Sequence, residues 1–182
     1  MSQSTWNIDP QHSSITFSVR HMAFAKVRGR FSSWSGSLRW DPEDPASARV
    51  SVSVDAASID TGVADRDAHL RSGDFLDVDS FPQFHFEAKR IEPAGEGQFK
   101  LSGDVTIKGT TREVVLDVHH GGRARDPWGY ERAAFEATAR IDRRDFGLTW
   151  NQTLETGGIL VGHEVAIEIE LQAVKEEAAA AS

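Results

Sequence analysis

Apolar and polar residues alternate along most of this chain with a period of two, the pattern of strands that bury one face. The clearest example is 13–21, in which Ile15, Phe17, Val19 and His21 share one face and the residues between them are polar. About eight segments alternate in this way: 13–21, 27–40, 48–56, 84–89, 99–107, 112–119, 133–141 and 161–171. One polar face on each segment favours an antiparallel sheet.

The segment 27–40 changes the parity of its apolar face partway along. Val27 and Phe31 occupy odd positions, whereas Leu38 and Trp40 occupy even positions. A change of parity inside a continuous run predicts a β-bulge, and the glycines nearby allow a sheet to curl.

The stretch Ser58–Pro82, which we call the insert, interrupts the alternation with helical spacing. Val63 and Leu70 fall on one face of a helix, and Arg66 and His69 fall on another. An amphipathic helix inside a β-rich chain must cover something, and we interpret the insert as the lid of a β-barrel.

Residues at both ends of this helix predict its length. Asp60 or Thr61 can cap its start, and Gly73 can end it. We expect residues 61–76 to form a helical cover whose apolar stripe, Val63 and Leu70, anchors it to the barrel.

Eight strands of this kind either close into a barrel or stack as a sandwich. A sandwich needs no cover, whereas the insert, the glycines and the many inward aromatic residues suit a barrel around an apolar space. The sequence therefore predicts an all-β fold, an eight-stranded antiparallel β-barrel with a short helical insert. One domain spans 1–175, and the alanine-rich residues 176–182 form a frayed tail.

Composition narrows the classes of partner. The net charge of −8 argues against a nucleic-acid partner. No apolar run approaches ~20 residues, so we expect no stable membrane insertion. The chain has no cysteine, which excludes disulfides and thiolate metal sites. The start of the chain lacks a basic flank followed by an apolar run, so we expect a cytoplasmic protein, or a periplasmic one if the sequence is a processed form.

Seven histidines raise the question of metal or acid–base chemistry. His119 and His120 are adjacent on a strand and point to opposite faces, so they cannot chelate one ion together. His69 and Asp65 have helical spacing, but no HExxH motif completes a ligand set, and no Gly-x-Ser-x-Gly elbow is present. We therefore expect no metal, no cofactor and no catalytic residue, and hence no enzyme.

A small closed barrel uses one inward face both as its core and as the wall of any ligand site. We expect a long-chain apolar lipid in an interior tunnel, because each buried methylene contributes roughly 0.8 kcal/mol to binding. The expected tunnel residues are Phe17, Val19, Phe31, Val52, Phe75, Phe84, Phe86, Phe99, Leu101, Val105, Phe135 and Phe146.

The polar residues of the insert have two interpretations, which do not exclude each other. Arg66, Asp67 and His69 form an ion-paired cap that ties the helix to the barrel rim, or they recognise the polar head of a lipid. His21 is the polar member of an inward face and needs a hydrogen-bond partner there. The residues expected at the head group or rim are His21, Arg66, Asp67, His69 and Arg143.

Short motifs spread over about 6–174 resemble those of the YceI-like family, whose members are also called polyisoprenoid-binding or lipocalin-like proteins. Each motif alone is weak, but their order and spacing together are specific. The motifs include Trp6-Asn-Ile-Asp-Pro, Phe17-Ser-Val-Arg-His-Met, Ser58-Ile-Asp-Thr, Arg66-Asp-Ala-His-Leu-Arg-Ser, Gly103-Asp-Val-Thr-Ile-Lys-Gly and Ile141-Asp-Arg-Arg-Asp-Phe-Gly.

The resemblance implies an extended lipocalin-like barrel with a long apolar tunnel, in a bacterial family with many periplasmic members. The implied ligands are polyisoprenoids, isoprenoid quinones or fatty-acid derivatives, which the protein would bind, transport, store or sequester without catalysis. Two alternatives stay open. One is an enzyme that acts on an isoprenoid lipid through His21, His69 or Arg66. The other is a barrel filled by its own side chains that serves in stress response or interaction. A homodimer is also left open.

Overall fold

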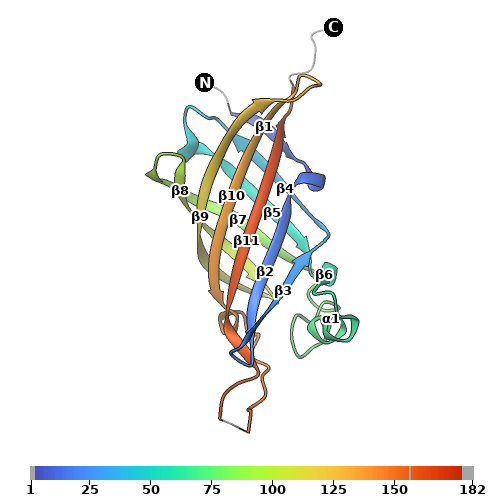
Figure 1. Ribbon diagram of the computed structural model, residues 1–182. Helices are drawn as coiled ribbons and strands as arrows, with labels where there is room; N and C mark the ends of the chain where they lie inside the picture. Colours follow the sequence, from blue (N-terminus) through green and yellow to red (C-terminus); the bar gives the residue numbers. More distant parts are fainter. Residues whose placement is uncertain (1–2, 156, 178–182) are drawn as a thin grey trace.

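The alternating segments form antiparallel strands in the computed structural model (Figure 1). The structure describes residues 3–155 and 157–177, so the tail predicted at 176–182 lies outside the described residues from 178 onward. The strands are β1 (Ser4–Ile8), β2 (Ser14–His21), β3 (Ala25–Phe31), β4 (Trp34–Trp40), β5 (Arg49–Asp55), β6 (Ile59–Asp60), β7 (Gln83–Gly95), β8 (Gln98–Ile107), β9 (Thr110–Arg125), β10 (Glu131–Asp142) and β11 (Val161–Lys175), and the helix is α1 (Ala64–Arg71). Short 3-10 turns occupy Pro10–His12, Pro45–Ser47, Ala56–Ser58 and Arg143–Phe146.

The sheet closes on itself because β1 and β2 both pair with β11. Trp6 of β1 lies opposite Lys175, and Phe17 of β2 lies opposite Ile167. β3 and β4 are likewise two parts of one interrupted strand, as are β5 and β6, so the closed barrel has eight antiparallel strand paths. The predicted eight-stranded barrel is confirmed.

The change of parity in 27–40 is a break between two strands and not the predicted β-bulge. β3 ends before Ser32, β4 begins after Ser33, and the neighbouring chain makes a 3-10 turn at Ala56–Ser58 beside this break. The Ser32 amide donates to the Ser58 carbonyl at 3.2 Å, and the Asp55 amide donates to the Ser33 carbonyl at 2.9 Å. Both chains are interrupted together, so these backbone groups stay paired while the barrel bends.

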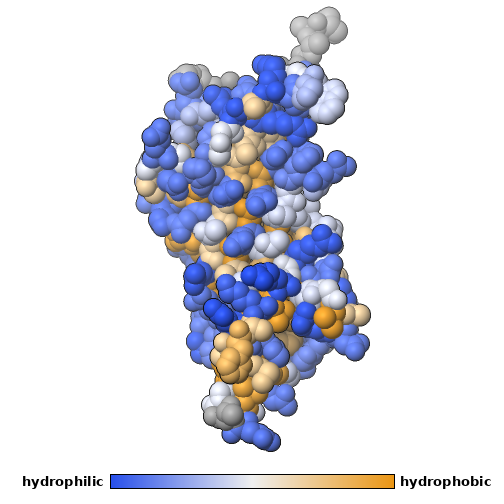
Figure 2. Space-filling model, in the orientation of Figure 1, coloured by the Kyte–Doolittle hydropathy of each residue, from blue (hydrophilic) through white to orange (hydrophobic). Residues whose placement is uncertain are grey.

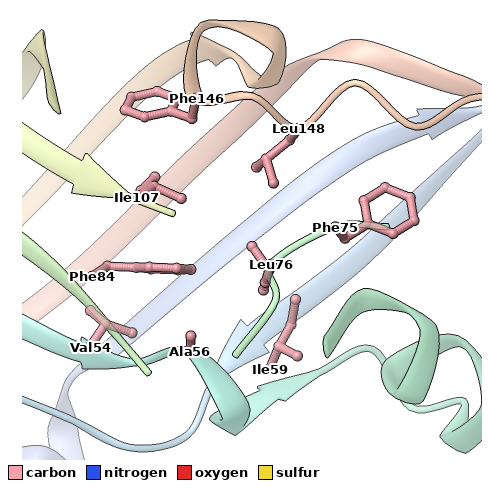
Figure 3. Close-up of a cluster of buried hydrophobic side chains, with 9 residues drawn as sticks. All are labelled: Val54, Ala56, Ile59, Phe75, Leu76, Phe84, Ile107, Phe146 and Leu148. Carbon is pink, nitrogen blue, oxygen red and sulfur yellow. The ribbon is translucent and has the colours of Figure 1, made fainter. Parts of the chain in front are cut away.

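The barrel has two distinct ends (Figure 1). At the upper end β9 turns into β10, near the start of β1 and the end of β11, and at the lower end residues 147–155 and 157–160 lie between β10 and β11. One buried cluster lies towards the lower end, where strands, insert and post-β10 turn meet (Figure 3): Val54, Ala56, Ile59, Phe75, Leu76, Phe84, Ile107, Phe146 and Leu148. A second cluster lies towards the upper end: Trp6, Leu38, Trp40, Ala133 and Ala173.

The outer face of the barrel is mostly hydrophilic, as the strand alternation requires. Figure 2 shows polar residues over most of the visible surface, with apolar residues visible between them along the middle of the barrel and near the lower end. Within the described part of the chain, no helix is both long enough and apolar enough to cross a membrane.

Candidate functional site

The barrel encloses a cavity of about 670 Å³ between the two buried clusters. This volume lies within the roughly 300–1,000 Å³ of small-molecule sites. The cavity therefore leaves space in the barrel that its own side chains do not fill. Its wall includes these predicted residues: Phe17, Val19, Phe31, Val52, Phe75, Phe84, Phe86, Phe99, Leu101, Val105 and Phe135.

Two predicted site residues do not reach the cavity. Phe146 is 1% exposed and packs in the lower cluster, because it lies on a 3-10 turn where strand alternation does not apply. Asp67 is buried but does not line the cavity, and its carboxylate accepts hydrogen bonds from the Thr61 amide at 2.9 Å and the Thr61 hydroxyl at 2.6 Å. Both residues therefore pack or bond behind the wall of the cavity and do not form part of it.

The structure also adds wall residues that the sequence did not single out. Trp34 and Trp40 stand on the even-numbered face of β4, and their alternation was visible in the sequence. Trp150 and Leu160 come from the irregular segment between β10 and β11 and carry no periodic signal. Leu76 follows α1 and joins the wall from the insert.

Aromatic rings close the upper end of the cavity. Trp40 and Phe135 line it, with ring centroids 5.2 Å apart and nearly perpendicular planes. His120 stacks on Phe135 at 4.9 Å, and Trp6 packs behind Trp40 at 5.3 Å. Burial lowers the pKa of His120, and its Nε2 atom has no hydrogen-bond partner in the described residues. This end suits the apolar terminus of a chain.

Four predicted polar residues line the cavity towards its lower end: His21, Arg66, His69 and Arg143. We call these four residues the polar end. The His69 ring lies 5.0 Å from the Phe75 ring, and the Arg143 guanidinium lies 6.0 Å from the same ring. His21 pairs with Val161 across the strands, and the Val161 carbonyl accepts a hydrogen bond from Arg143 at 3.3 Å. The cavity thus has one apolar end and one polar end.

Arg143 is a buried cation in this wall. Its residue is 3% exposed, and it donates to the carbonyl oxygens of Gly162 at 2.8 Å, Leu148 at 2.6 Å and Val161 at 3.3 Å. Burial lowers the pKa of the guanidinium, which still keeps its charge at neutral pH because an arginine ordinarily loses its proton only in strong base. The bonds to Val161 and Gly162 tie the turn after β10 to the start of β11, and the bond to Leu148 holds the chain that follows the turn.

Arg66 and His69 lie on the helix of the insert, and this helix is shorter than predicted. α1 spans only Ala64–Arg71, and Val63 occupies its N-cap position without a side-chain cap. Asp60 and Thr61 do not cap it: Asp60 accepts from the Gly62 amide at 2.9 Å, and Thr61 is bound by Asp67. The predicted cover over 61–76 is therefore one helix followed by turns.

The predicted anchoring stripe of the insert is only partly correct. Val63 is 46% exposed, whereas Leu70 packs against the lower cluster and lines the cavity. Phe75 and Leu76, which follow α1, also belong to this cluster, as does Ile59, and Val78 packs against it. Arg66 and His69 also line the cavity, so α1 turns its polar face towards it.

Of the four residues of the polar end, His69 alone has a carboxylate partner in the described part of the chain. Its Nε2 lies 2.9 Å from Asp74 Oδ2, and its ring lies 4.7 Å from Trp150. No group of three or more His, Asp or Glu side chains in 3–155 and 157–177 is placed to hold a metal ion.

Comparison with known proteins gives a family. The family model for the YceI-like domain matches residues 6–173. A UPF0312 protein of Vibrio cholerae is 37% identical over 137 residues, which are 75% of this chain and 72% of the relative. A UPF0312 protein of Shewanella baltica is 39% identical over the same shares.

Solved structures share the fold. BcnA of Burkholderia cenocepacia superposes with a TM-score of 0.81 at 24% identity, covering 91% of this chain and 99% of BcnA. A polyisoprenoid-binding domain from Saccharophagus degradans, implicated in plant cell wall breakdown, superposes with a TM-score of 0.66 at 13% identity, covering 94% of this chain and 98% of that domain. At these identities the likeness shows the fold alone.

Proposed function

This chain belongs to the YceI-like family, and on that premise we propose that its barrel binds one long-chain apolar lipid and releases it chemically unchanged. The observation that carries the proposal is the cavity of about 670 Å³ with an apolar wall, an aromatic upper end and polar groups at its lower end. A single-headed lipid has the same polarity along its length. The candidate ligands are polyisoprenoids, isoprenoid quinones and fatty-acid derivatives.

The polarity of the cavity also supports one orientation of the ligand along the barrel. A polar head buried without hydrogen bonds costs several kcal/mol, so the head belongs where donors lie. Arg66, His69 and Arg143 line the lower end, whereas Trp40 and Phe135 close the upper end. We therefore place the head at the polar end and the tail towards Trp40. The polyisoprenoid-binding domain of Saccharophagus degradans supports this ligand class through its shared fold.

One observation favours a second candidate, an enzyme that acts on the bound lipid. His69 lies 2.9 Å from the Asp74 carboxylate and lines the cavity, an arrangement that can orient an imidazole for proton transfer. Incubation of the protein with a candidate lipid, followed by mass spectrometry of the extract, separates the two functions. Binding without any change in lipid mass supports a carrier, and turnover that is lost in His69→Gln supports the enzyme.

The binding proposal is tested by narrowing the cavity from one strand. Ala137 of β10 lines the cavity, and its neighbour Thr138 is exposed on the outer face. We expect Ala137→Phe to weaken binding of a long-chain alcohol about tenfold or more in a calorimetric titration, because loss of two methylene contacts at roughly 0.8 kcal/mol each already gives that factor. Thr138→Phe is the matched control and leaves the affinity unchanged. Equal affinities in both variants would place the ligand outside the barrel.

A further inference from the structure

We infer that the polar end of the cavity selects a lipid whose head is an anion, a carboxylate or a phosphate, over lipids with neutral heads. This inference rests on the proposed function, and it goes further by naming the chemical class of the head. It is carried by Arg66 and Arg143, which line the cavity and have no carboxylate partner in the described chain; Arg20, the third arginine of the lining, is exposed.

The contrast between two consecutive arginines is the strongest part of this observation. Arg144 is exposed and takes the neighbouring carboxylate, with its Nε 3.0 Å and its Nη2 2.6 Å from the Asp142 oxygens. Arg143 is 3% exposed and has only the carbonyl oxygens of Leu148, Val161 and Gly162. Asp142 attracts Arg143 without bonding it, because the Asp142 carboxylate bonds Arg144. A buried charge without a directly bonded counter-ion is unfavourable, so this acid would serve better at Arg143 than at Arg144. An anionic ligand would supply the missing charge.

The bonds that Arg143 makes leave donors for such a ligand. A guanidinium has five N–H groups, and the three carbonyl bonds of Arg143 account for three of them. The carbonyls fix the side chain in place before a ligand arrives, which lowers the entropy lost on binding. Planar guanidinium groups bind carboxylates and phosphates through paired hydrogen bonds.

Arg66 of α1 repeats this arrangement in the lining of the cavity. Its Nε donates to the Thr61 hydroxyl at 2.7 Å and its Nη2 to the Thr61 carbonyl at 2.9 Å, again without an ion pair among residues 3–155 and 157–177. Thr61 itself is held by Asp67, whose carboxylate accepts from the Thr61 amide at 2.9 Å. Asp67 therefore positions Arg66 through Thr61.

The acids around the polar end do not cancel these charges. Asp65 also lines the cavity, but it is exposed at the mouth, where water screens its carboxylate. Asp74 is engaged by His69 at 2.9 Å. Asp67 lies outside the wall and bonds Thr61, which separates its carboxylate from the Arg66 guanidinium. The lining of the cavity therefore holds three arginines, Arg20, Arg66 and Arg143, and one acid, the exposed Asp65, in a chain whose net charge is −8.

Matched ligands test the inference on the unmodified protein. The delipidated protein is titrated calorimetrically with hexadecanoate, hexadecanamide and hexadecanol, which share one tail, and with farnesyl phosphate and farnesol, which share another. We expect each anion to bind about tenfold or more tightly than its neutral partners, because a charge-assisted hydrogen bond is roughly twice as strong as a neutral one. The ratio of the affinities of anion and alcohol, compared between the hexadecyl and farnesyl series, shows whether the site prefers a carboxylate or a phosphate.

A pair of variants on one helix separates the site from the scaffold. Arg71 of α1 donates to the Ala57 carbonyl at 2.8 Å and the Ile59 carbonyl at 3.0 Å, as Arg66 donates to Thr61, but Arg71 does not line the cavity. We expect Arg66→Gln to reduce the preference for hexadecanoate over hexadecanol and Arg71→Gln to leave that preference unchanged. This pair avoids Arg143, whose replacement endangers folding.

The outcomes distinguish this inference from the function on which it rests. Equal affinities for charged and neutral heads would overturn the anion preference and leave lipid binding in place. A preference that persists unchanged in Arg66→Gln would remove Arg66 from the site. Failure of all five ligands to bind would overturn the proposed function and the inference with it.

Discussion

The ring of Phe17 lies against its cross-strand partner Gly29, so closely that a methyl group on Gly29 would stand 2.4 Å from Phe17 Cζ. Phe86 lies against Gly103 of the neighbouring strand in the same way, at 2.5 Å from the equivalent methyl position. Both rings line the cavity. Each glycine lets an aromatic ring rest along the wall, which leaves the barrel axis open.

Gly29→Ala is therefore expected to push the Phe17 ring off the wall and into the cavity. We expect weaker binding of a long-chain lipid, and a loss of about 1–3 kcal/mol in the free energy of unfolding from overpacking. The control is Gly73→Ala, because nothing lies within 4 Å of the added methyl there. Calorimetric titration and denaturant unfolding of both variants provide the measurements. Unchanged binding in Gly29→Ala would mean that Phe17 does not shape the site.

Trp6 should be one of the strongest stabilising residues of the upper end. It is 1% exposed, packs against Trp40 and lies behind the end of the cavity. Trp6→Ala is expected to cost about 3–5 kcal/mol in the free energy of unfolding, the range for a large buried aromatic residue. Trp128, which is 77% exposed, is the matched control, and its replacement by Ala should change stability by less than about 0.5 kcal/mol. Similar losses in the two variants would contradict the packing described for Trp6.

Asp67 should stabilise the insert, although it lies outside the cavity wall. It is 6% exposed and accepts two hydrogen bonds from Thr61. Asp67→Ala leaves these donors without a partner and should cost about 1–3 kcal/mol. Asp65→Ala is the control on the same helix, since Asp65 is exposed. Hydrogen exchange should show faster opening of 61–71 in Asp67→Ala alone, and equal protection in both variants would argue against this role.

His120 predicts a dependence of stability on pH. Burial lowers its pKa in the folded protein below the ordinary value of 6.5, so the unfolded chain takes up a proton first as pH falls. The free energy of unfolding should therefore decrease below pH 6.5, by at most about 1.4 kcal/mol per pH unit from this one group. Unfolding measured at several pH values in wild type and His120→Phe checks this. A decrease of the same size in His120→Phe would assign it to other groups.

A second titration lies in a separate range and does not obscure that of His120. Arg132 and His12 hold the pKa of the Asp9 carboxyl down at about 2, against an ordinary 3.8. The stability that Asp9 contributes is therefore present above pH 3.8 and is lost as pH falls through about 2. Asp9 therefore does not change the free energy of unfolding between pH 4 and 6.5, the range in which His120 is expected to change it.

Strand periodicity was enough to predict the cavity wall, because a period of two assigns every second residue to the inside. Val19, Phe84 and Leu101 needed nothing more. The same rule failed at Phe146, which follows β10 on a 3-10 turn. The rule also made no prediction for Trp150, which lies in an irregular segment. Trp150 reaches the cavity because Asn151 and Arg143 both donate to the Val161 carbonyl and hold that segment against β11.

The polar end shows what helical spacing can and cannot decide. Spacing placed Arg66 and His69 on one face of the insert, and both line the cavity. It could not show that Asp67, one residue away, is buried against Thr61, or that Val63 is exposed. Those outcomes depend on how α1 sits on β6 and on the turns that follow it. The same holds for Arg143, whose lack of a carboxylate becomes visible only when Arg144 is seen to bind Asp142.

Whether the cavity holds a lipid can be measured by native mass spectrometry of the gently purified protein. We expect a species heavier than the chain by the mass of one long-chain lipid, which an organic extract then identifies. The same species should be depleted in Ala137→Phe and retained in Thr138→Phe. A protein that carries no added mass, and that takes up none of the long-chain ligands after delipidation, would show that the cavity is not a lipid-binding site.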